Sequence, residues 1–385
     1  MGLKATNGVY LKKLNRKRIL DSLRRSACSR AELAKRTALS RAAISLLTEE
    51  LISEGILIET DKISAKAGRR PTMLRLCAHR FYALGISIAR DQTKIGFINF
   101  EGNVLYAQTV AEDNTAAESV TYMADAIHDM IERHAIDRKK LLGIGISAPG
   151  PINVREGTIL TPPNLEKWHH FPICERLHHL TNLPVSVENN ANSLALAENH
   201  YGCGGQHDSM MVMTVDTGIG AGIILNQQLF RGDNGFGSEV GHICVNVNGS
   251  LCACGNRGCL ELYAARRAIL KKAANISPRY DCFEKIVDSA IDGDTGCIQI
   301  LDYMANYLSI GIVNVLNLFD LEAVVLSGDV VYKPDLLLSN LRQKVNARSM
   351  VRNFRKIPLF VSGLHGDVDI LCAASIVLDK YFSEI

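Results

Sequence analysis

The sequence has few of the features that would place it in a membrane, outside the cell or among disordered chains. No apolar run approaches the ~20 residues that a membrane-spanning helix needs. The N-terminal stretch is charged and lacks the apolar block and the small-residue cleavage site of a secretory signal. Repeats and low-complexity tracts are absent, and the 385 residues include 10 prolines and a single tryptophan. These absences favour a cytoplasmic globular chain of two or three domains, with reduced thiols or metal ligands among its 11 cysteines.

The net charge of +3 conceals an uneven distribution of charge along the chain. Residues 1–75 contain 17 Lys and Arg against 7 Asp and Glu, a net charge of +10. The remaining residues include 26 basic and 33 acidic ones, a net charge of −7. This asymmetry indicates a module that binds a polyanion, joined to a body that does not. The alternative is a basic surface that contacts only solvent.

The basic segment has the pattern of a winged helix-turn-helix. Apolar residues at helical spacing predict a helix over 14–25, and two serines are suitable N-caps for helices over 30–36 and 40–53. Strands at 56–59 and 73–76 flank a polar tip and would form the wing. In this motif the second of the two short helices lies in the major groove of double-stranded DNA.

The expected DNA contacts follow from this arrangement. On the second short helix they are Ser40, Arg41, Ser45 and Thr48, and in the wing tip they are Arg69 and Arg70. Arg41 is the first candidate for a base contact, because bidentate arginine is the commonest specific reader of guanine. The two wing arginines suit phosphate or minor-groove contacts. The alternative is a helical hairpin that only packs against the rest of the chain.

Beyond this head, apolar strands alternate with helices, which is typical of a layered α/β domain. The expected strands cover 82–88, 94–100, 142–147, 185–188, 210–215, 222–225 and 323–327. Helical patterns cover 116–134 and 297–318.

One segment has the ligand spacing of a metal site. His242 precedes Cys252, Cys254 and Cys259 in the pattern His-x9-Cys-x-Cys-x4-Cys. One imidazole and three thiolates can complete the tetrahedral shell of a structural zinc ion, and two nearby glycines let the loop bend back. A chance grouping of buried cysteines is the alternative. Cys244 is a substitute ligand by position, although the alternation of its strand points it away from His242.

Several loops end in Asn, Glu and His side chains, which suit a polyhydroxyl ligand because they both donate and accept hydrogen bonds. These loops are 163–165, 188–192, 238–242 and 260–261. A glycine-rich turn at 216–222 is also able to approach a phosphate closely, although most such turns are only hairpins.

These segments resemble the ROK family of repressors and sugar kinases. The resemblance is carried by GISAPGPIN (145–153), VENNANSLALAE (187–198), VDTGIGAGIIL (215–225), GSEVGHI (237–243) and CACGNRGCLE (252–261). It implies an α/β, actin-like (ribonuclease H-like), two-lobed sugar-kinase fold behind the winged helix-turn-helix. The implied domains are the head at 1–77, a first lobe at 78–190 completed by 366–385, and a second lobe with a zinc knuckle at 191–365.

The same resemblance implies the ligands and their residues. One structural Zn²⁺ per chain would bind His242, Cys252, Cys254 and Cys259. A sugar between the lobes would contact Asn164, Asn189, Glu239, His242 and Glu261. His242 would bind the metal with one nitrogen and face the sugar with the other, so that the metal fixes its tautomer.

Departures from the kinases of the family predict a chain that is not an enzyme and has no catalytic residues. The stretch 87–94 lacks both glycines of the phosphate loop that the kinases carry after the first strand. Asn190 occupies the position of their catalytic aspartate, and an amide has no useful basicity. A weaker departure is the segment 327–329, where the kinases usually have a glycine run.

The resemblance is closest to the xylose-repressor type. We therefore expect a sugar-responsive repressor of a carbohydrate-utilisation operon, whose partners are double-stranded operator DNA and a monosaccharide effector. A two-fold operator implies a homodimer or homotetramer. One alternative is an active ATP-dependent sugar kinase with an appended DNA-binding head. Another is a regulator whose effector is a protein.

Overall fold

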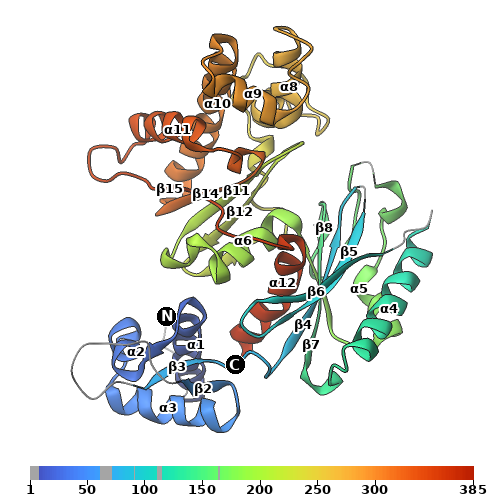
Figure 1. Cartoon of the computed structure of the whole chain (residues 1–385), viewed down its shortest axis with the longest axis vertical. Coiled ribbons are helices and arrows are strands. Elements are labelled where there is room, and N and C mark those ends of the chain that lie inside the picture. Colours follow the sequence, from blue (N-terminus) through green and yellow to red (C-terminus); the bar gives the residue numbers. More distant parts are fainter. Residues whose placement is uncertain (1–7, 61–71, 91, 111–114, 164) are drawn as a thin grey trace. The chain divides into compact units, whose positions relative to one another are not determined.

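The computed structural model describes residues 8–60, 72–90, 92–110, 115–163 and 165–385. The chain forms two compact units (Figure 1). The first unit contains the chain up to Ser193 together with His365–Ile385, and the second contains Leu194–Leu364. The head is part of the first unit in this division. The expectation that it forms a domain of its own therefore stays a prediction.

The described residues of the head form three helices and a small antiparallel sheet. The helices are α1 (Gly8–Arg25), α2 (Arg30–Thr37) and α3 (Arg41–Ser53). The strands β1 (Cys28–Ser29), β2 (Leu57–Thr60) and β3 (Met73–Leu76) pair in the order β1-β3-β2. This is the predicted winged helix-turn-helix order. The wing tip, with Arg69 and Arg70, lies outside the described residues.

Local hydrogen bonds set the turn between α2 and α3. The Ser29 hydroxyl accepts a hydrogen bond from the backbone N–H of Glu32, whose carboxylate accepts one from the N–H of Ser29. This capping box starts α2. Ala38 ends α2 in the left-handed conformation, with φ of 55°, and the Ser40 hydroxyl then accepts from the N–H of Ala43 at the start of α3. Both helix starts therefore follow from serines that the sequence supplies.

The rest of the first unit is a five-stranded sheet in the order β10-β7-β4-β5-β6. Its strands are β4 (Tyr82–Ile88), β5 (Thr93–Asn99), β6 (Val104–Val110), β7 (Leu141–Ala148) and β10 (Val185–Asn189). Helices α4 (Ala116–Arg133) and α5 (Ile173–Thr181) cover one face, and α12 (Val368–Glu384) covers the other (Figure 1). A two-stranded hairpin joins β8 (Ile152–Asn153) to β9 (Thr158–Ile159). Strand β6 was not among the expected strands, and this edge strand is mostly half-exposed or exposed.

The C-terminal helix α12 completes the first unit because the sheet below it lacks side chains at key positions. A Cβ atom at Gly85 would lie 2.6 Å from the carbonyl oxygen of Ile370, and one at Gly145 would lie 2.0 Å from that of Ala373. Both distances are too short for any side chain. Glycine at these two strand positions therefore allows the helix backbone to pack directly on β4 and β7.

The second unit has a sheet in the order β13-β12-β11-β14-β15. Its strands are β11 (Met210–Val215), β12 (Ile219–Leu225), β13 (Gln228–Phe230), β14 (Ala323–Gly328) and β15 (Leu359–Val361). Its helices are α7 (Glu261–Ala264), α8 (Arg266–Ala274), α9 (Phe283–Ile291), α10 (Thr295–Phe319) and α11 (Asp335–Arg348), while α6 (Asn190–Tyr201) spans the boundary with the first unit. The core includes Met211 and Met213 of β11 together with buried residues of α10, such as Met304 and Leu308.

The two five-stranded sheets have the same connectivity. In each, three successive strands form an antiparallel meander, β4-β5-β6 in the first unit and β11-β12-β13 in the second. The first strand of each meander, β4 or β11, also pairs in parallel with a later strand, β7 or β14. That later strand pairs in parallel with the last strand of its sheet, β10 or β15. Two copies of this α/β topology confirm the predicted actin-like fold. None of the described helices combines the length and the apolar character needed to cross a bilayer.

Candidate functional site

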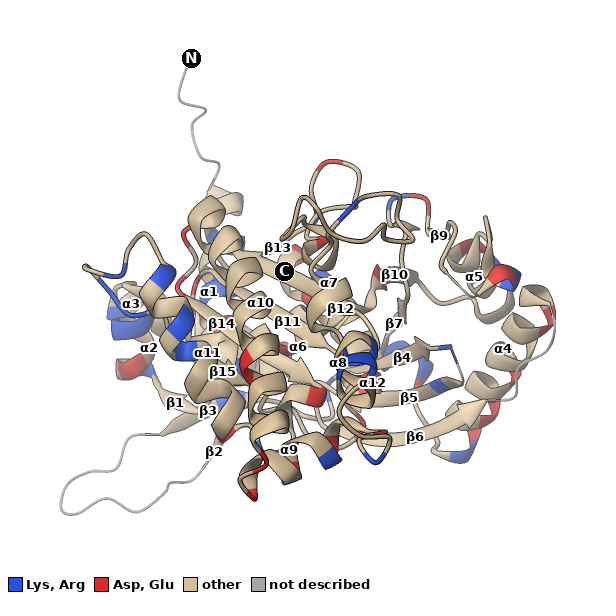
Figure 2. Ribbon diagram, turned by 90° about the horizontal axis from the view of Figure 1, so that it is seen from above, with Lys and Arg blue, Asp and Glu red and all other residues tan. Residues whose placement is uncertain are grey.

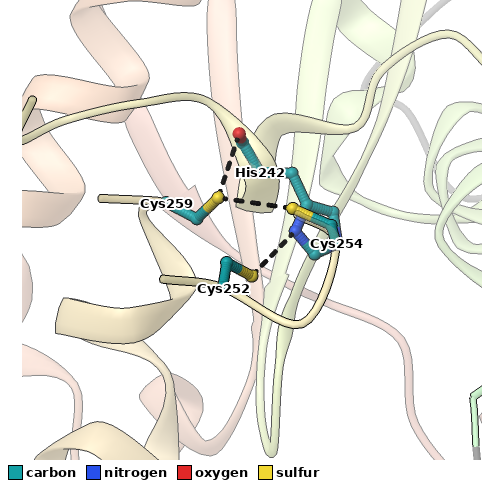
Figure 3. A group of neighbouring side chains, drawn as sticks. All are labelled: His242, Cys252, Cys254 and Cys259. Atoms are coloured by element: carbon teal, nitrogen blue, oxygen red, sulfur yellow. Dashed lines mark hydrogen bonds between the residues drawn. The ribbon is translucent and has the colours of Figure 1, made fainter. Parts of the chain in front are cut away.

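Four side chains of the second unit converge beside α7. His242 ends a short 3-10 helix (Val240–His242), and three cysteines lie on the loop that leads into α7. We call residues 242–261 the knuckle. The ligand atoms of His242, Cys252, Cys254 and Cys259 all lie within 4.8 Å of one another (Figure 3). The predicted metal-ligating residues are therefore brought together.

The knuckle folds tightly because of its backbone. Isolated bridges pair Cys244 with Cys259 and Leu251 with Arg257, which closes the loop on itself. Gly258 has a φ of 69°, and a Cβ atom there would lie 1.8 Å from the carbonyl oxygen of Asn246. Only glycine fits at this position.

The separations of the four ligand atoms fit a tetrahedral metal shell. The sulfur of Cys252 is 3.7 Å from Nδ1 of His242, and the sulfurs of Cys254 and Cys259 are 3.6 Å apart. Metal–ligand bonds of ~2.3 Å to sulfur and ~2.0 Å to nitrogen would give tetrahedral edges of roughly 3.5–3.8 Å. Cys244 is exposed and lies outside this cluster. The cluster is thus able to hold a four-coordinate metal ion.

The three thiols ionise differently without a metal. Burial raises the pKa of the Cys252 thiol to about 12 and also raises the pKa of Cys259. A hydrogen bond from the backbone N–H of Asn256 lowers the pKa of Cys254. A bound cation would hold all three as thiolates, since metal binding displaces their protons.

Two carboxylates flank His242. Oε1 of Glu261 lies 3.5 Å from Nδ1 of His242 and accepts a hydrogen bond from the Cys252 thiol at 3.0 Å. The backbone N–H of His242 donates to the carbonyl oxygen of Glu239 at 3.0 Å. Glu239 is exposed, yet the protein around its carboxyl displaces enough water to raise its pKa. Three of the five expected sugar-contacting residues therefore lie together in the second unit.

The other two expected sugar contacts come from the earlier part of the chain. Asn189 ends β10 in the first unit, where its Oδ1 accepts a hydrogen bond from the N–H of Ala191 at 2.9 Å. Asn164 lies outside the described residues. Asn190, at the position of the kinase base, is exposed at the start of α6, and its Oδ1 accepts from the same N–H at 2.9 Å.

An ion-pair network that the sequence analysis missed lies at the glycine-rich turn between β11 and β12. Arg266, the first residue of α8, pairs with Asp216 at 2.6 Å and with Asp329 at 2.9 Å. Burial raises the pKa of the Asp329 carboxyl to about 6. Because two carboxylates face one guanidinium, the turn disfavours a negatively charged phosphate, although its glycines would allow a phosphate to approach closely. No sequence signal links these three residues, because they lie far apart along the chain.

The exposed face of α3 differs from the predicted one at two positions. Ser40 and Arg41 are exposed and Ser45 is half-buried, as a contact surface requires. Thr48, expected on this face, is instead 0% exposed. Its hydroxyl donates to the carbonyl oxygen of Ser45 and accepts from Nε of Arg30, both at 3.1 Å, so it has no group to offer DNA. Leu46, which the sequence analysis did not single out, is 60% exposed.

The basic residues of the head fall into two groups. One group forms ion pairs inside the head, as Arg16 does with Glu54 and Arg30 with Glu59. The other group is exposed and has no ion pair in the part of the head that the structure describes, and it includes Arg18, Lys35, Arg36 and Arg41. Figure 2 shows the basic residues over the helices of the head. This second group gives the head a surface suited to a polyanion.

Comparison with known proteins identifies the family. The sequence profile of the ROK family matches residues 83–380, which include both lobes and the knuckle. The chain belongs to the ROK family. The profile begins where the head ends, so the head is an addition to the ROK body.

The relatives of this ROK protein differ in how much of the chain they match. The xylose repressor of Caldicellulosiruptor bescii is 33% identical, and the match covers 97% of this chain and 98% of that protein. A glucokinase of Thermotoga maritima is 28% identical, and the match covers 77% of this chain and 97% of the kinase. The chain therefore shares nearly its full length with the repressor and a shorter part with the kinase.

A solved structure supports the fold of the whole chain. A ROK family transcriptional regulator, described as a homologue of the MLC protein of E. coli, superimposes with a TM-score of 0.79 at 24% identity. The match covers 97% of this chain and 97% of that chain.

Proposed function

We propose that this ROK protein is a sugar-responsive transcriptional repressor of a carbohydrate-utilisation operon, of the xylose type. The observation that carries the proposal is a winged helix-turn-helix head on a ROK body, with nearly the full length matched by the C. bescii repressor. The head would bind double-stranded operator DNA, and the body would sense the sugar.

The DNA surface is the exposed face of α3 and its surroundings. Arg41 would read a guanine, with Ser40 and Ser45 close to it near the start of the helix. Arg69 and Arg70 of the wing would contact phosphates or the minor groove. A two-fold operator would be bound by a homodimer or homotetramer in the cytoplasm.

The metal is proposed to be one structural Zn²⁺ per chain, held by His242 and the three knuckle cysteines. One nitrogen and three sulfurs fill a tetrahedral shell, which leaves no open position for chemistry. When bound, the ion would cross-link the knuckle and keep the thiols deprotonated. Because Nδ1 of His242 faces the sulfurs, Nε2 is the nitrogen that remains for a sugar hydroxyl.

The sugar would be a monosaccharide bound by the groups around His242. The carboxylates of Glu239 and Glu261 would accept hydrogen bonds from its hydroxyls, and the amides of Asn164 and Asn189 would both accept and donate. Sugar binding would favour one of two arrangements of the chain that differ in affinity for the operator.

The chain is proposed to have no kinase activity. Asn190 has no basicity with which to activate a sugar hydroxyl, and the turn beside Arg266 carries two carboxylates where a kinase would need to hold phosphates. The likeness to the T. maritima glucokinase makes a kinase with an appended head the competing function.

One experiment separates these functions. Operator binding and ATP consumption would be measured on the purified chain across a panel of pentoses, hexoses and N-acetylated hexosamines. We expect one sugar to change the operator affinity at least ~10-fold, the size of a typical coupling free energy, without consuming ATP. Glu239→Gln should remove the sugar effect and preserve operator binding, whereas Glu284→Gln, at an exposed position of α9, should change neither.

Two results would overturn the proposal. Sugar phosphorylation that Glu239→Gln abolishes would establish the kinase. Operator binding that no sugar alters would favour a regulator whose effector is a protein.

A further inference from the structure

Leu46 occupies an unusual position for a large apolar side chain. The other leucines and isoleucines of α3 are buried or half-buried, and Ile44 and Leu51 have no exposed surface. Leu46 is 60% exposed, although it lies in the middle of the helix. A single exposed leucine is common on protein surfaces, so the residues around Leu46 decide whether its exposure indicates a binding surface.

The neighbours of Leu46 form the outermost strip of α3. Ala42 precedes it by one helical turn and Glu49 follows three residues later, and both are exposed. This strip lies on the side of the helix away from Ile44 and Leu47, which pack into the head. Ala42 and Leu46 together therefore present a short apolar surface, and Arg41 stands beside it at the start of the helix.

The charge of the surroundings indicates what this surface binds. Arg18, Lys35, Arg36 and Arg41 are exposed cations of the same small head, and none forms an ion pair among its described residues. The corresponding face of a second copy would carry the same charge and be repelled. The complementary partner is a polyanion that also displays apolar groups. The major groove of DNA has this combination, because each thymine places a 5-methyl group there between the phosphate backbones.

We propose that Leu46 contacts the 5-methyl group of a thymine in the operator and is a specificity-determining residue. The inference rests on the proposed DNA-binding function of the head. Leu46 lies in the first half of α3, the part of a recognition helix that reaches base edges. The methyl group of Ala42, one turn earlier, allows close approach of the helix to the groove. The operator then has a thymine close to the guanine that Arg41 reads.

The test begins with the full-length protein and a library of random DNA duplexes. Binding sites are selected with wild-type protein, and each thymine of the selected site is then replaced singly by uracil, which lacks only the methyl group. Losing contact with one methyl group is worth ~0.8 kcal/mol, so wild-type affinity should fall roughly fourfold at one thymine in each half-site. In Leu46→Ala the same replacement should change affinity less than twofold.

A matched variant tests whether the preference for thymine over uracil depends on Leu46. Leu11→Ala removes another exposed leucine of the head, 44% exposed on α1, and should keep the wild-type preference for thymine over uracil. Thermal unfolding of Leu46→Ala should match the wild type, because the side chain is exposed.

The outcomes are distinct for the two proposals. Failure to enrich any sequence would refute DNA recognition by the head, and with it this inference. An enriched site at which wild type and Leu46→Ala show equal ratios for thymine and uracil would refute the role of Leu46 alone.

Discussion

The head and the second unit are distinguished by two sets of charged side chains, exposed cations in the head and buried carboxyls in the second unit. In the head, Lys35 and Arg41 are exposed and form no ion pair with any described residue. In the second unit, Glu198 is 0% exposed and Asp329 is largely buried, and burial raises the pKa of both carboxyls. Exposed cations suit a partner that brings its own charge, as DNA does. Groups fixed inside the protein suit a small ligand, because they are positioned before it arrives.

Removing a metal ligand should have the largest effect, because the proposed ion would cross-link four side chains of the knuckle. Cys254→Ala leaves one nitrogen and two sulfurs for the ion. We expect the metal content to fall from about one ion per chain to well below one, and the free energy of unfolding to fall by at least ~3 kcal/mol. Elemental analysis and chemical denaturation measure the two changes.

The neighbouring cysteine provides the control for that variant. Cys244 lies close by in the sequence but is exposed and outside the cluster, so Cys244→Ala should retain both the metal and the stability. A Cys254→Ala protein with unchanged metal content and stability would refute the assignment of the ligands.

In the head, replacing the exposed Arg41 should weaken DNA binding and leave the stability of the protein unchanged. Arg41→Ala should lower affinity for the specific operator roughly 5–150-fold, since a bidentate contact with guanine is worth ~1–3 kcal/mol. Affinity for unrelated DNA should fall much less. Fluorescence anisotropy with specific and unrelated duplexes at one salt concentration measures both losses.

Lys35→Ala serves as the comparison, because Lys35 is an exposed cation of α2 rather than of the recognition helix. It should weaken binding to both duplexes by a similar factor, as a phosphate contact does. If Arg41→Ala also lost affinity for the specific and the unrelated duplex by the same factor, Arg41 would be a phosphate contact and not a base contact.

The fold could be predicted from the sequence where local chemistry determines it. Ser29 and Ser40 mark the starts of α2 and α3 because their hydroxyls cap those helices. The knuckle could be predicted for the same reason, since its four ligands lie within 18 residues of one another. The place of α12 in the first unit came only from the resemblance, because it depends on glycines such as Gly85 that lie far away in the sequence.

The functional surfaces were harder to predict where exposure decides the role. Ile44 and Leu51 lie at helical spacing, and both are buried in the core of the head. Helical spacing could not decide whether the side chains of Thr48 and Leu46 are exposed. The hydroxyl of Thr48 satisfies its hydrogen bonds inside the head, and the apolar character of Leu46 suggests burial. Arg266 was missed because its two carboxylate partners, Asp216 and Asp329, lie in distant segments of the sequence. These cases depend on packing that no short segment encodes.

A further comparison concerns the pH dependence of stability in the second unit. The pKa of Asp329 is about 6 in the folded chain against an ordinary value of 3.8, so the folded state keeps the proton to higher pH than the unfolded state does. The contribution of Asp329 to stability must therefore fall as the pH rises from about 4 to about 6, and stay constant above that. Asp329→Asn cannot ionise and should lack this dependence. The difference in unfolding free energy between wild type and variant, measured by urea denaturation across pH 4–7, isolates it.

The sign of that difference distinguishes the buried carboxylate from an ordinary ion pair. If pairing with Arg266 outweighed burial, wild type would gain stability over Asp329→Asn as the pH rises, and the raised pKa would be wrong. The head should show no counterpart in this range, because an arginine keeps its charge there. A pH-dependent difference between wild type and Arg41→Ala would therefore contradict the contrast between exposed and buried charges.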